Sequence, residues 1–181
     1  MIQGRGMSGK SGDFWVFGYG SLMWRPGFAH VETQRAHLHG YRRALCVRSW
    51  VHRGTQETPG LVLGLDRGGS CVGMAFRVPS ALSGEVMAYL RERELVTHVY
   101  AERQVRLKLD DGGIVTAVTY VCDRRHQQYA GAMDAAEAAE IVRSAHGQSG
   151  ANADYVLNTV SHIKALGIRD HWLEAVAGAL G

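Results

Sequence analysis

The order of the predicted elements is the feature that most limits what this chain can fold into, because strands come first and helices come last. Segments rich in β-branched and aromatic residues dominate the first two thirds of the chain, and helical apolar patterns fill the last third. The sequence therefore predicts an α+β fold: a small, mostly antiparallel β-barrel, with one helix between strands and further helices at the C-terminal end. The expected strand segments are 14–17, 33–48, 61–65, 71–78, 99–109 and 114–122.

Turn and helix signals separate these segments. Residues 66–69 (Asp-Arg-Gly-Gly) predict a turn between two strands, and residues 110–113 (Asp-Asp-Gly-Gly) predict a hairpin. We expect the helix between the strands over residues 81–95, with Ser80 as its N-cap. The C-terminal helices are expected at 134–146, 152–166 and 170–180.

The length and composition suit a single globular domain. A chain of 181 residues with 46% hydrophobic residues can build one full-sized core. We expect this domain over residues 13–181, after a Gly/Ser-rich, disordered leader over residues 1–12. Residues 9–11 (Gly-Lys-Ser) resemble the end of a phosphate-binding loop, but the earlier glycine and the preceding strand of that motif are missing.

Composition also argues against several classes of partner. The net charge is only +3 and the arginines are scattered, so a nucleic-acid surface is not favoured. No apolar run approaches the roughly 20 residues of a membrane span, and no signal-peptide pattern opens the chain. Cys46, Cys71 and Cys122 are an odd number without Cys-x-x-Cys spacing, which favours reduced thiols. The sequence thus predicts a cytoplasmic protein that binds neither nucleic acid nor membrane.

The first strand runs into a glycine-rich loop, Phe-Gly-Tyr-Gly-Ser-Leu-Met, at residues 17–23. Glycines flank Tyr19, and glycine adopts positive φ angles without steric cost. Such a backbone can direct successive N–H groups into one concavity that binds an anion. A dinucleotide fingerprint is excluded because Met23 replaces the third glycine, and a hydrolase nucleophile elbow is excluded because Ser21 directly follows Gly20. A simple tight turn is the alternative interpretation.

Glu94 is a carboxylate where the helix over residues 81–95 should be apolar. At 3.6 residues per turn it shares an arc with Val86, Met87 and Leu90. Burial and the nearby helix C-terminus both raise a carboxyl pKa, and a carboxyl that titrates closer to neutral pH suits general acid/base catalysis. The alternatives are a frayed last turn and a salt bridge to Arg91 or another arginine.

Other chemistry-bearing side chains are weaker candidates. Glu85 lies nearly opposite Glu94 on the helical wheel and is expected to be an exposed first-turn residue. His37 and His39 alternate as two metal ligands on a strand would, but no third ligand is evident nearby.

Taken together, the motifs resemble those of the ChaC-type γ-glutamylcyclotransferases, which act on glutathione. The resemblance extends from Phe14 to about Leu173, and the set of motifs in this order is specific although each motif alone is weak. The matching segments are FGYGSLMWRPGF (17–28), GYRR (40–43), HRG (52–54) with PG (59–60), YLRERE (89–94), LDDGGIVTAVTYV (109–121), HQQYAG (126–131) and GQSGANADYVLNTV (147–160).

The resemblance implies a small α+β barrel that uses no metal and no organic cofactor. Family members cyclise a γ-glutamyl group to 5-oxoproline, so glutathione would yield 5-oxoproline and cysteinylglycine. By motif, the loop that holds the γ-glutamyl group would be Tyr19, Gly20, Ser21 and Leu22, with Glu94 as the catalytic acid/base.

Further residues would line the same pocket or close over it. Tyr155 and Tyr100 would line the pocket, and the loop with His52 and Arg53 can close over the glycyl carboxylate. One departure concerns the segment before Tyr100, where the family usually carries a glycine and this chain has His98 and Val99.

Two other functions remain open from the sequence. The protein can be a cyclotransferase for other γ-glutamyl amines or γ-glutamyl amino acids, or a non-catalytic module that binds γ-glutamyl groups. Against the module, an idle buried carboxylate costs several kcal/mol unless it is paired. The sequence leaves the choice between monomer and dimer open.

Overall fold

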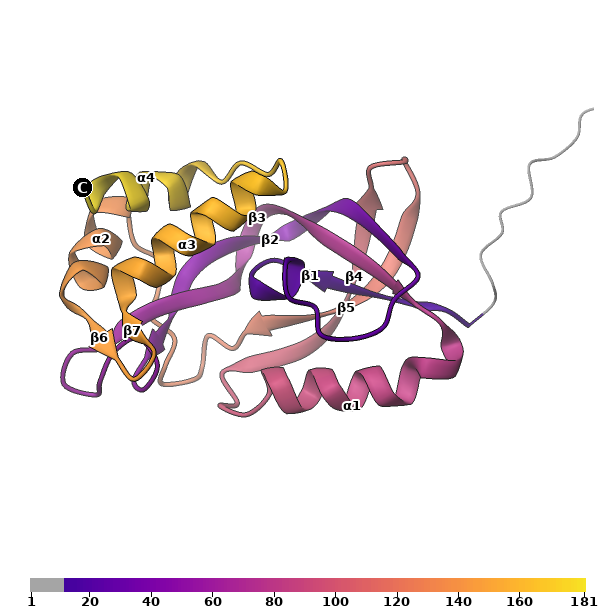
Figure 1. Cartoon of the computed structure of the whole chain (residues 1–181), viewed down its shortest axis with the longest axis horizontal. Coiled ribbons are helices and arrows are strands. Elements are labelled where there is room, and N and C mark those ends of the chain that lie inside the picture. The colour runs from indigo at the N-terminus through magenta and orange to yellow at the C-terminus, as the bar shows by residue number, and fades with distance from the viewer. Residues whose placement is uncertain (1–11) are drawn as a thin grey trace, which may run out of the picture.

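The computed structural model describes residues 12–181 (Figure 1). The predicted leader and the phosphate-loop-like residues 9–11 lie outside the described residues, apart from Gly12. Within residues 12–181, five strands close into a barrel in the order β1-β3-β2-β4-β5. Neighbouring strands are antiparallel except for β1 and β5, which are parallel, so the predicted mostly antiparallel barrel is confirmed. The strands are β1 Phe14–Gly18, β2 Glu32–Ser49, β3 Gly60–Val78, β4 Tyr100–Leu109 and β5 Ile114–Cys122.

The predicted turn at residues 66–69 is wrong, because β3 continues through it as one strand of 19 residues. The glycine pair does adopt positive φ angles, +98° at Gly68 and +72° at Gly69, but it forms an irregularity in the ladder instead of reversing the chain. The partner strand β2 has its own irregularity opposite, where Gly40 has a φ of +98°. Such irregularities bend long strands, and here they let β2 and β3 curve around the barrel.

The predicted hairpin at residues 110–113 is confirmed, since β4 and β5 pair directly across it. The helix between the strands is α1, Ser83–Glu94. Ser80 is not its N-cap: a 3₁₀ turn, η2 (Ser80–Leu82), precedes the helix, and Leu82 holds the N-cap position without a side-chain hydrogen bond. Ser80 instead donates its backbone N–H to Asp13 Oδ1 (3.1 Å).

The three C-terminal helices pack against one another at one end of the barrel, whereas α1 lies along its side (Figure 1). A short hairpin, β6 (His146–Gly147) and β7 (Gly150–Ala151), connects the first two of them. The helices are α2 Ala135–Ser144, α3 Asn152–Ala165 and α4 His171–Ala179. Asp134 caps α2 with a capping box to Glu137, and Asp170 caps α4.

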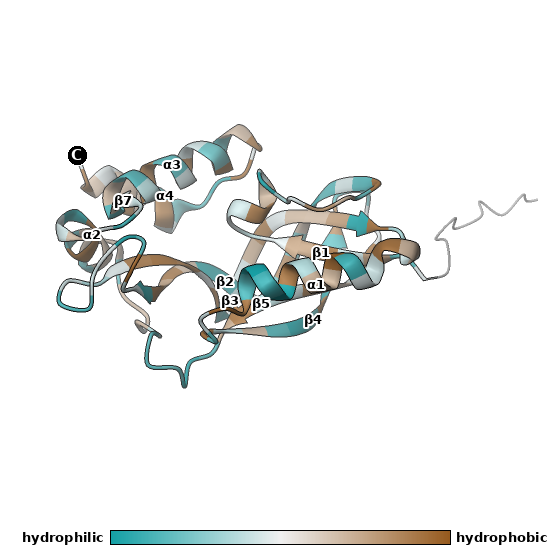
Figure 2. Ribbon diagram, turned by 60° about the horizontal axis from the view of Figure 1, so that its bottom comes forward, coloured by the Kyte–Doolittle hydropathy of each residue, from teal (hydrophilic) through white to brown (hydrophobic). Residues whose placement is uncertain are grey.

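Two of the three apolar cores in the described residues join the helices to the barrel. The larger core joins the barrel interior to α2, α3 and α4, with Phe17, Leu65 and Ile163 among its fully buried members. The smaller core packs Val86 and Leu90 of α1 against the outer face of the barrel, and Figure 2 shows α1 in front of β1, β4 and β5. Among the described residues, no helix is long and apolar enough to cross a membrane.

Candidate active site

A small cavity opens between the loop after β1, the end of α1, the start of β4 and the start of α3. Its volume is about 110 Å³. This is well below the roughly 300–1,000 Å³ of pockets for drug-sized ligands, so it suits one amino-acid-sized group. The lining residues come from six elements (β1, β3, α1, β4, β5 and α3) and the loop after β1; they are Phe17, Tyr19, Gly20, Ser21, Leu22, Leu63, Glu94, Tyr100, Tyr120 and Tyr155.

The loop after β1 builds one wall of this cavity, but not by the predicted backbone geometry. Neither Gly18 nor Gly20 has a positive φ angle, and Gly20 has a φ of −133°. The chain instead enters a 3₁₀ turn, η1 (Ser21–Met23), whose first N–H groups have no partner within the turn. Gly18 lets the end of β1 pack closely against Leu22, since a Cβ on residue 18 would lie 3.0 Å from the Leu22 Cβ.

Glu94 is the last residue of α1, and its side chain points into the cavity with an exposed fraction of 18%. The apolar arc of α1 therefore includes it as the periodicity predicts, while Val86 and Leu90 are buried and Glu92 is exposed. Burial raises the pKa of the Glu94 carboxyl, and the positive charge of Arg93 opposes part of that rise. The carboxyl is thus shifted toward the range of a general acid/base.

Arg93 connects the end of α1 to the loop after β1 through side-chain hydrogen bonds. Its Nη1 donates to the carbonyl oxygens of Arg25 (2.7 Å) and Pro26 (3.2 Å). Its Nη2 donates to Ser21 Oγ (2.9 Å), and its Nε lies 3.6 Å from Glu94 Oε1. The alternative of a salt bridge to Glu94 thus holds for Arg93 only at long distance, while Arg91 pairs with Glu102.

Tyr100 and Tyr155 bind the two polar groups of one residue, Leu63 of β3. The Tyr100 hydroxyl donates to the Leu63 carbonyl (2.6 Å), and the Leu63 N–H donates to the Tyr155 hydroxyl oxygen (3.0 Å). The Tyr155 proton therefore remains available to donate, and the Tyr100 oxygen remains available to accept. Two similar phenols thus present opposite hydrogen-bonding roles to the cavity.

These phenols stay protonated at neutral pH. Burial raises the pKa of Tyr155 to about 12, although its hydrogen bond with Leu63 and the charge of Arg53 oppose the rise. Burial, and then the neighbouring Tyr100 and Glu94, raise the pKa of Tyr19 well above its usual value. The pKa of Glu94 is instead shifted upward, toward neutral pH, while the pKa values of the tyrosines are shifted away from it.

Asn152, three residues before Tyr155 on α3, makes the equivalent contact two residues earlier on β3. Its Oδ1 accepts from the Leu61 N–H (2.8 Å) and its Nδ2 donates to the Leu61 carbonyl (2.9 Å). This part of β3 has β2 on one side only, because β1 pairs with residues 74–78. Side chains of α3 thus satisfy the open edge of β3 and fix Tyr155 beside the cavity.

The loop between β2 and β3 carries His52 and Arg53, and it is tied to the β6–β7 hairpin. The N–H of Ser149 donates to the His52 carbonyl (2.9 Å), and Ser149 Oγ lies 3.0 Å from His52 Nδ1. A Cβ on Gly147 would lie 2.4 Å from the Val51 carbonyl oxygen, so only glycine allows this contact. His52 is exposed and does not line the cavity.

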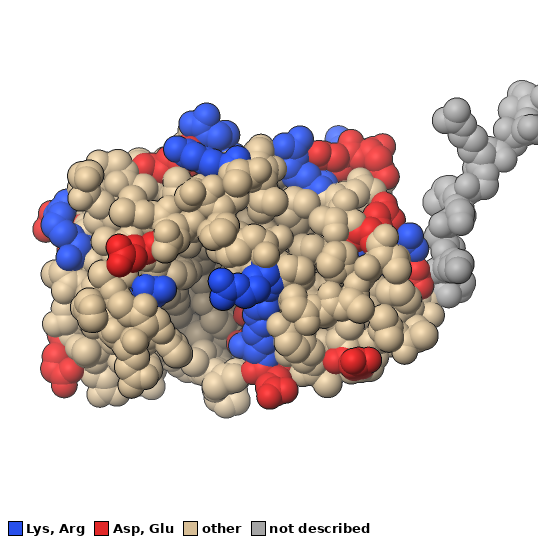
Figure 3. All heavy atoms as spheres, in the orientation of Figure 1, with Lys and Arg blue, Asp and Glu red and all other residues tan. Residues whose placement is uncertain are grey.

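Arg53 lies over the ring of Tyr155, with its Cζ 5.6 Å from the ring centroid. Its Nη1 donates to the Ala151 carbonyl (3.2 Å), and within residues 12–181 it forms no ion pair with an acidic side chain. Figure 3 shows a hollow between the region of the β6–β7 hairpin and the region of α1, with basic side chains on both sides. Arg53 thus stands next to the cavity rather than inside it.

The weaker sequence candidates lie away from the cavity. Glu85 is exposed at the start of α1, as predicted. His37 and His39 are exposed on β2, and no group of three His, Cys, Asp or Glu side chains in the described part of the chain is arranged to hold a metal ion.

The segment before Tyr100 has a left-handed residue. His98 has a φ of +59°, the conformation that glycine adopts most readily. The positive φ angle at this position explains why the resemblance leads us to expect a glycine in this segment. The turn around His98 connects Glu94 to Tyr100, so it sets the spacing of two cavity-lining side chains.

Sequence reasoning missed the residues that organise the cavity without lining it. Arg93 is adjacent to Glu94 within the YLRERE segment, but helical periodicity alone gives no sign that it binds loop carbonyls. Asn152 is a polar residue on the apolar face of α3, in line with Val156 and Val160. A polar residue in an apolar pattern is the sequence feature that could have identified it.

The fold is shared with a solved γ-glutamyl cyclotransferase structure. It matches the crystal structure of the selenomethionine-labelled γ-glutamyl cyclotransferase specific to glutathione from yeast with a TM-score of 0.81. The match covers 94% of this chain and 96% of that chain at 22% sequence identity.

The protein belongs to the ChaC-like family: the family model described as "ChaC-like protein" matches residues 14–180. It is 36% identical over 162 residues to the glutathione-specific γ-glutamylcyclotransferase of Escherichia coli (strain K12), covering 90% of this chain and 70% of that protein. It is 32% identical over 173 residues to glutathione-specific γ-glutamylcyclotransferase 1 of Mus musculus, covering 92% of this chain and 78% of that protein. The family expected from the motifs is confirmed.

Proposed function

We propose that the protein cyclises the γ-glutamyl group of glutathione to 5-oxoproline and releases cysteinylglycine. The observation that carries the proposal is a buried carboxyl with a raised pKa, Glu94, in an amino-acid-sized cavity lined by protonated tyrosines. The names of the relatives from Escherichia coli and Mus musculus support glutathione as the substrate.

The reaction needs a proton acceptor more than a nucleophile from the protein, because the substrate attacks itself. Its α-amine bonds to its own γ-carbonyl carbon and closes a five-membered ring, and the bond from that carbon to the cysteinyl nitrogen breaks. An α-amino group titrates near pH 8, so it must first lose a proton. In this proposal Glu94 takes that proton and returns it to the leaving nitrogen.

The loop and the tyrosines bind and orient the γ-glutamyl group. The first N–H groups of η1, at Ser21 and Leu22, together with the Gly20 N–H, can hold the α-carboxylate or the developing oxyanion. Tyr155 retains a proton to donate to the substrate, and Tyr100 retains an oxygen that can accept from the α-amine. Tyr19 forms part of the wall, and a folded glutamyl chain brings amine and carbonyl together.

The remainder of glutathione lies outside the cavity, which has room for one amino-acid-sized group. We propose that Arg53 binds the glycyl carboxylate, since its guanidinium covers Tyr155 and has no acidic partner within the described residues. A γ-glutamyl amine would leave this arginine unused. We also propose a cytoplasmic location, which the three buried free cysteines support.

Product analysis after incubation with glutathione tests the proposal. Wild type should form 5-oxoproline and cysteinylglycine in equal amounts, and Glu94→Gln should lower kcat by about 10²–10⁴-fold, the usual contribution of a general acid/base. Glu85→Gln, on the exposed start of the same helix, should leave kcat unchanged. Binding of glutathione without any product would favour the non-catalytic module, and faster turnover of a simple γ-glutamyl amine would favour the broader cyclotransferase.

A further inference from the structure

We propose that Arg43 is a positioning residue of the active site: it fixes the orientation of the peptide group between Tyr19 and Gly20, and Asp170 of the α4 N-cap holds Arg43 in place. This inference rests on the proposed use of the loop after β1 as the substrate-binding loop. It extends the active site to a helix that contributes no side chain to the cavity.

The strand irregularity at Gly40 turns Arg43 inward. Before Gly40, the buried residues of β2 are the even-numbered Ala36 and Leu38. After it, they are the odd-numbered Arg43 and Leu45. A one-residue change of register exchanges the two faces of a strand. Gly40 therefore places an arginine at a position where the barrel is otherwise apolar.

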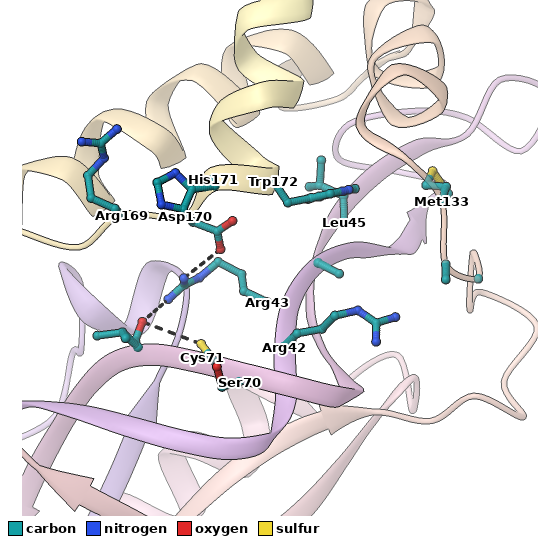
Figure 4. Close-up of a pocket in the computed structure, with 14 residues that line it drawn as sticks. Arg42, Arg43, Leu45, Ser70, Cys71, Met133, Arg169, Asp170, His171 and Trp172 are labelled. Carbon is teal, nitrogen blue, oxygen red and sulfur yellow. Dashed lines mark hydrogen bonds and ion pairs between the residues drawn. The ribbon is translucent and has the colours of Figure 1, made fainter.

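The Arg43 guanidinium is almost fully buried, with a side-chain exposure of 2%, and it connects three parts of the fold. Its Nε donates to the Tyr19 carbonyl (2.6 Å) and its Nη2 donates to the Val72 carbonyl of β3 (2.7 Å). Its Nη1 forms an ion pair with Asp170 Oδ2 (3.0 Å). Figure 4 shows Arg43 between Asp170 above and β3 below.

The bond to the Tyr19 carbonyl determines where the next N–H points. A trans peptide is planar, with its C=O and the following N–H in opposite directions, and residues 12–181 contain no cis peptide. Arg43 holds the Tyr19 oxygen from behind the loop, so the Gly20 N–H is directed to the other side, where Gly20 lines the cavity. The donor that faces the substrate is thus oriented from the back.

Asp170 serves two elements with its two oxygens. Oδ1 accepts from the Leu173 N–H (3.0 Å) and caps α4, while Oδ2 pairs with Arg43. The start of α4 is therefore coupled through one carboxylate and one guanidinium to the Tyr19–Gly20 peptide.

The ion pair with Asp170 supplements the two carbonyl hydrogen bonds of Arg43 on the side where packing leaves space. A second cavity of about 490 Å³ lies against Arg43 and Asp170, lined also by Leu45, Cys71 and Trp172 (Figure 4). Without Asp170, the guanidinium would have room to move into this space and release the Tyr19 carbonyl.

Steady-state kinetics of two variants test the inference. Asp170→Asn keeps an oxygen that can cap α4 but removes the charge that pairs with Arg43. Arg43→Lys keeps the charge but cannot serve three acceptors in one plane. For each we expect kcat/KM for glutathione to fall about 10- to 100-fold, less than the 10²–10³-fold lost when an oxyanion donor is removed outright. The double variant should lose no more than Arg43→Lys alone, because both act through one contact.

The matched control is Arg42→Lys, on the neighbouring residue of β2, whose guanidinium pairs with Asp66 and not with the loop. It should leave kcat/KM close to that of wild type, because lysine keeps the positive charge beside Asp66 and residue 42 makes no hydrogen bond to the loop. In ¹⁵N-labelled protein, the Gly20 amide resonance should shift in Asp170→Asn and Arg43→Lys but not in Arg42→Lys.

The outcomes separate this inference from the proposed function. If folded Asp170→Asn keeps wild-type kcat/KM and an unshifted Gly20 resonance, the positioning role is refuted even though the enzyme is active. If wild type makes no 5-oxoproline, the proposed function fails, and the Gly20 resonance alone then decides whether Arg43 orients this peptide.

Discussion

The side-chain amide of Asn152 binds both the N–H and the C=O of Leu61, at 2.8 and 2.9 Å, in the manner of a neighbouring strand. Asn152 is completely buried at the first position of α3, and the edge of β3 that it covers has no strand partner there. One turn later on α3, Tyr155 receives the Leu63 N–H. The position of a cavity-lining phenol therefore depends on how an asparagine docks α3 on β3.

Asn152→Ala should destabilise the protein by about 2–6 kcal/mol, because two buried backbone groups each lose a partner worth roughly 1–3 kcal/mol. For a chain of this size that lowers Tm by about 4–24 °C. Thermal unfolding followed by circular dichroism measures the change. Asn158→Ala, at an exposed position of the same helix, should change stability by no more than about 0.5 kcal/mol. Equal losses in the two variants would show that helix content, and not the Leu61 contact, is responsible.

Glu94→Gln should make the protein more stable at neutral and alkaline pH than wild type. Burial raises the folded-state pKa of Glu94 above its unfolded value. The carboxyl therefore contributes its stability below the unfolded pKa and loses it as pH rises through the folded pKa. The difference in Tm between variant and wild type should grow with pH over that interval and then stay constant.

Thermal unfolding of both proteins across pH 4–9 measures this difference. Glu92→Gln is the control, because Glu92 is exposed near the same helix end. If it gave an equal gain, the cause would be the helix dipole and not burial. A gain specific to Glu94 would mean that stability is sacrificed at this site for reactivity.

Periodicity and element order made much of this structure predictable. The apolar arc of α1 identified Glu94, because a helical wheel depends only on spacing within one element. The position of Arg43 depends instead on the irregularity at Gly40, and nothing in the local sequence says which of two adjacent arginines turns inward. Similarly, Gly68 and Gly69 permit either a turn or a bulge, and only the continued pairing with β2 selects the bulge.

His98→Gly should stabilise the protein by about 0.5–1 kcal/mol. A left-handed φ costs an L-residue roughly 1–2 kcal/mol, and glycine avoids this cost. Glycine also loses more conformational entropy on folding, which cancels part of the gain. The His98 side chain is exposed, so few contacts are lost. His98→Val should act in the opposite direction, by about 1 kcal/mol or more, because a β-branched residue is poorly tolerated at φ +59°.

Urea unfolding of the two variants checks these signs, with unchanged m-values as the sign that only stability differs. Stabilisation by valine as well as by glycine would refute the argument from backbone conformation. The expected result would show that the left-handed backbone at position 98 carries strain that glycine relieves.

Arg53→Ala should raise KM for glutathione about 5- to 30-fold and leave kcat nearly unchanged. A charge-assisted hydrogen bond to the glycyl carboxylate is worth about 1–2 kcal/mol, and it would be the same in the ground and transition states because the carboxylate is remote from the reacting bond. Glutathione whose glycyl carboxylate is esterified should show the higher KM with wild type, and Arg53→Ala should add little to it.

The matched control is Arg106→Ala, which removes the same charge from an exposed position on β4 outside the cavity. Its KM should equal that of wild type, so any effect of net charge alone is measured. If Arg53→Ala raised KM equally for glutathione and for its ester, the arginine would act by covering Tyr155 rather than by binding the carboxylate. Such a result would leave the cyclisation site intact and move the determinant of glutathione selectivity away from the loop between β2 and β3.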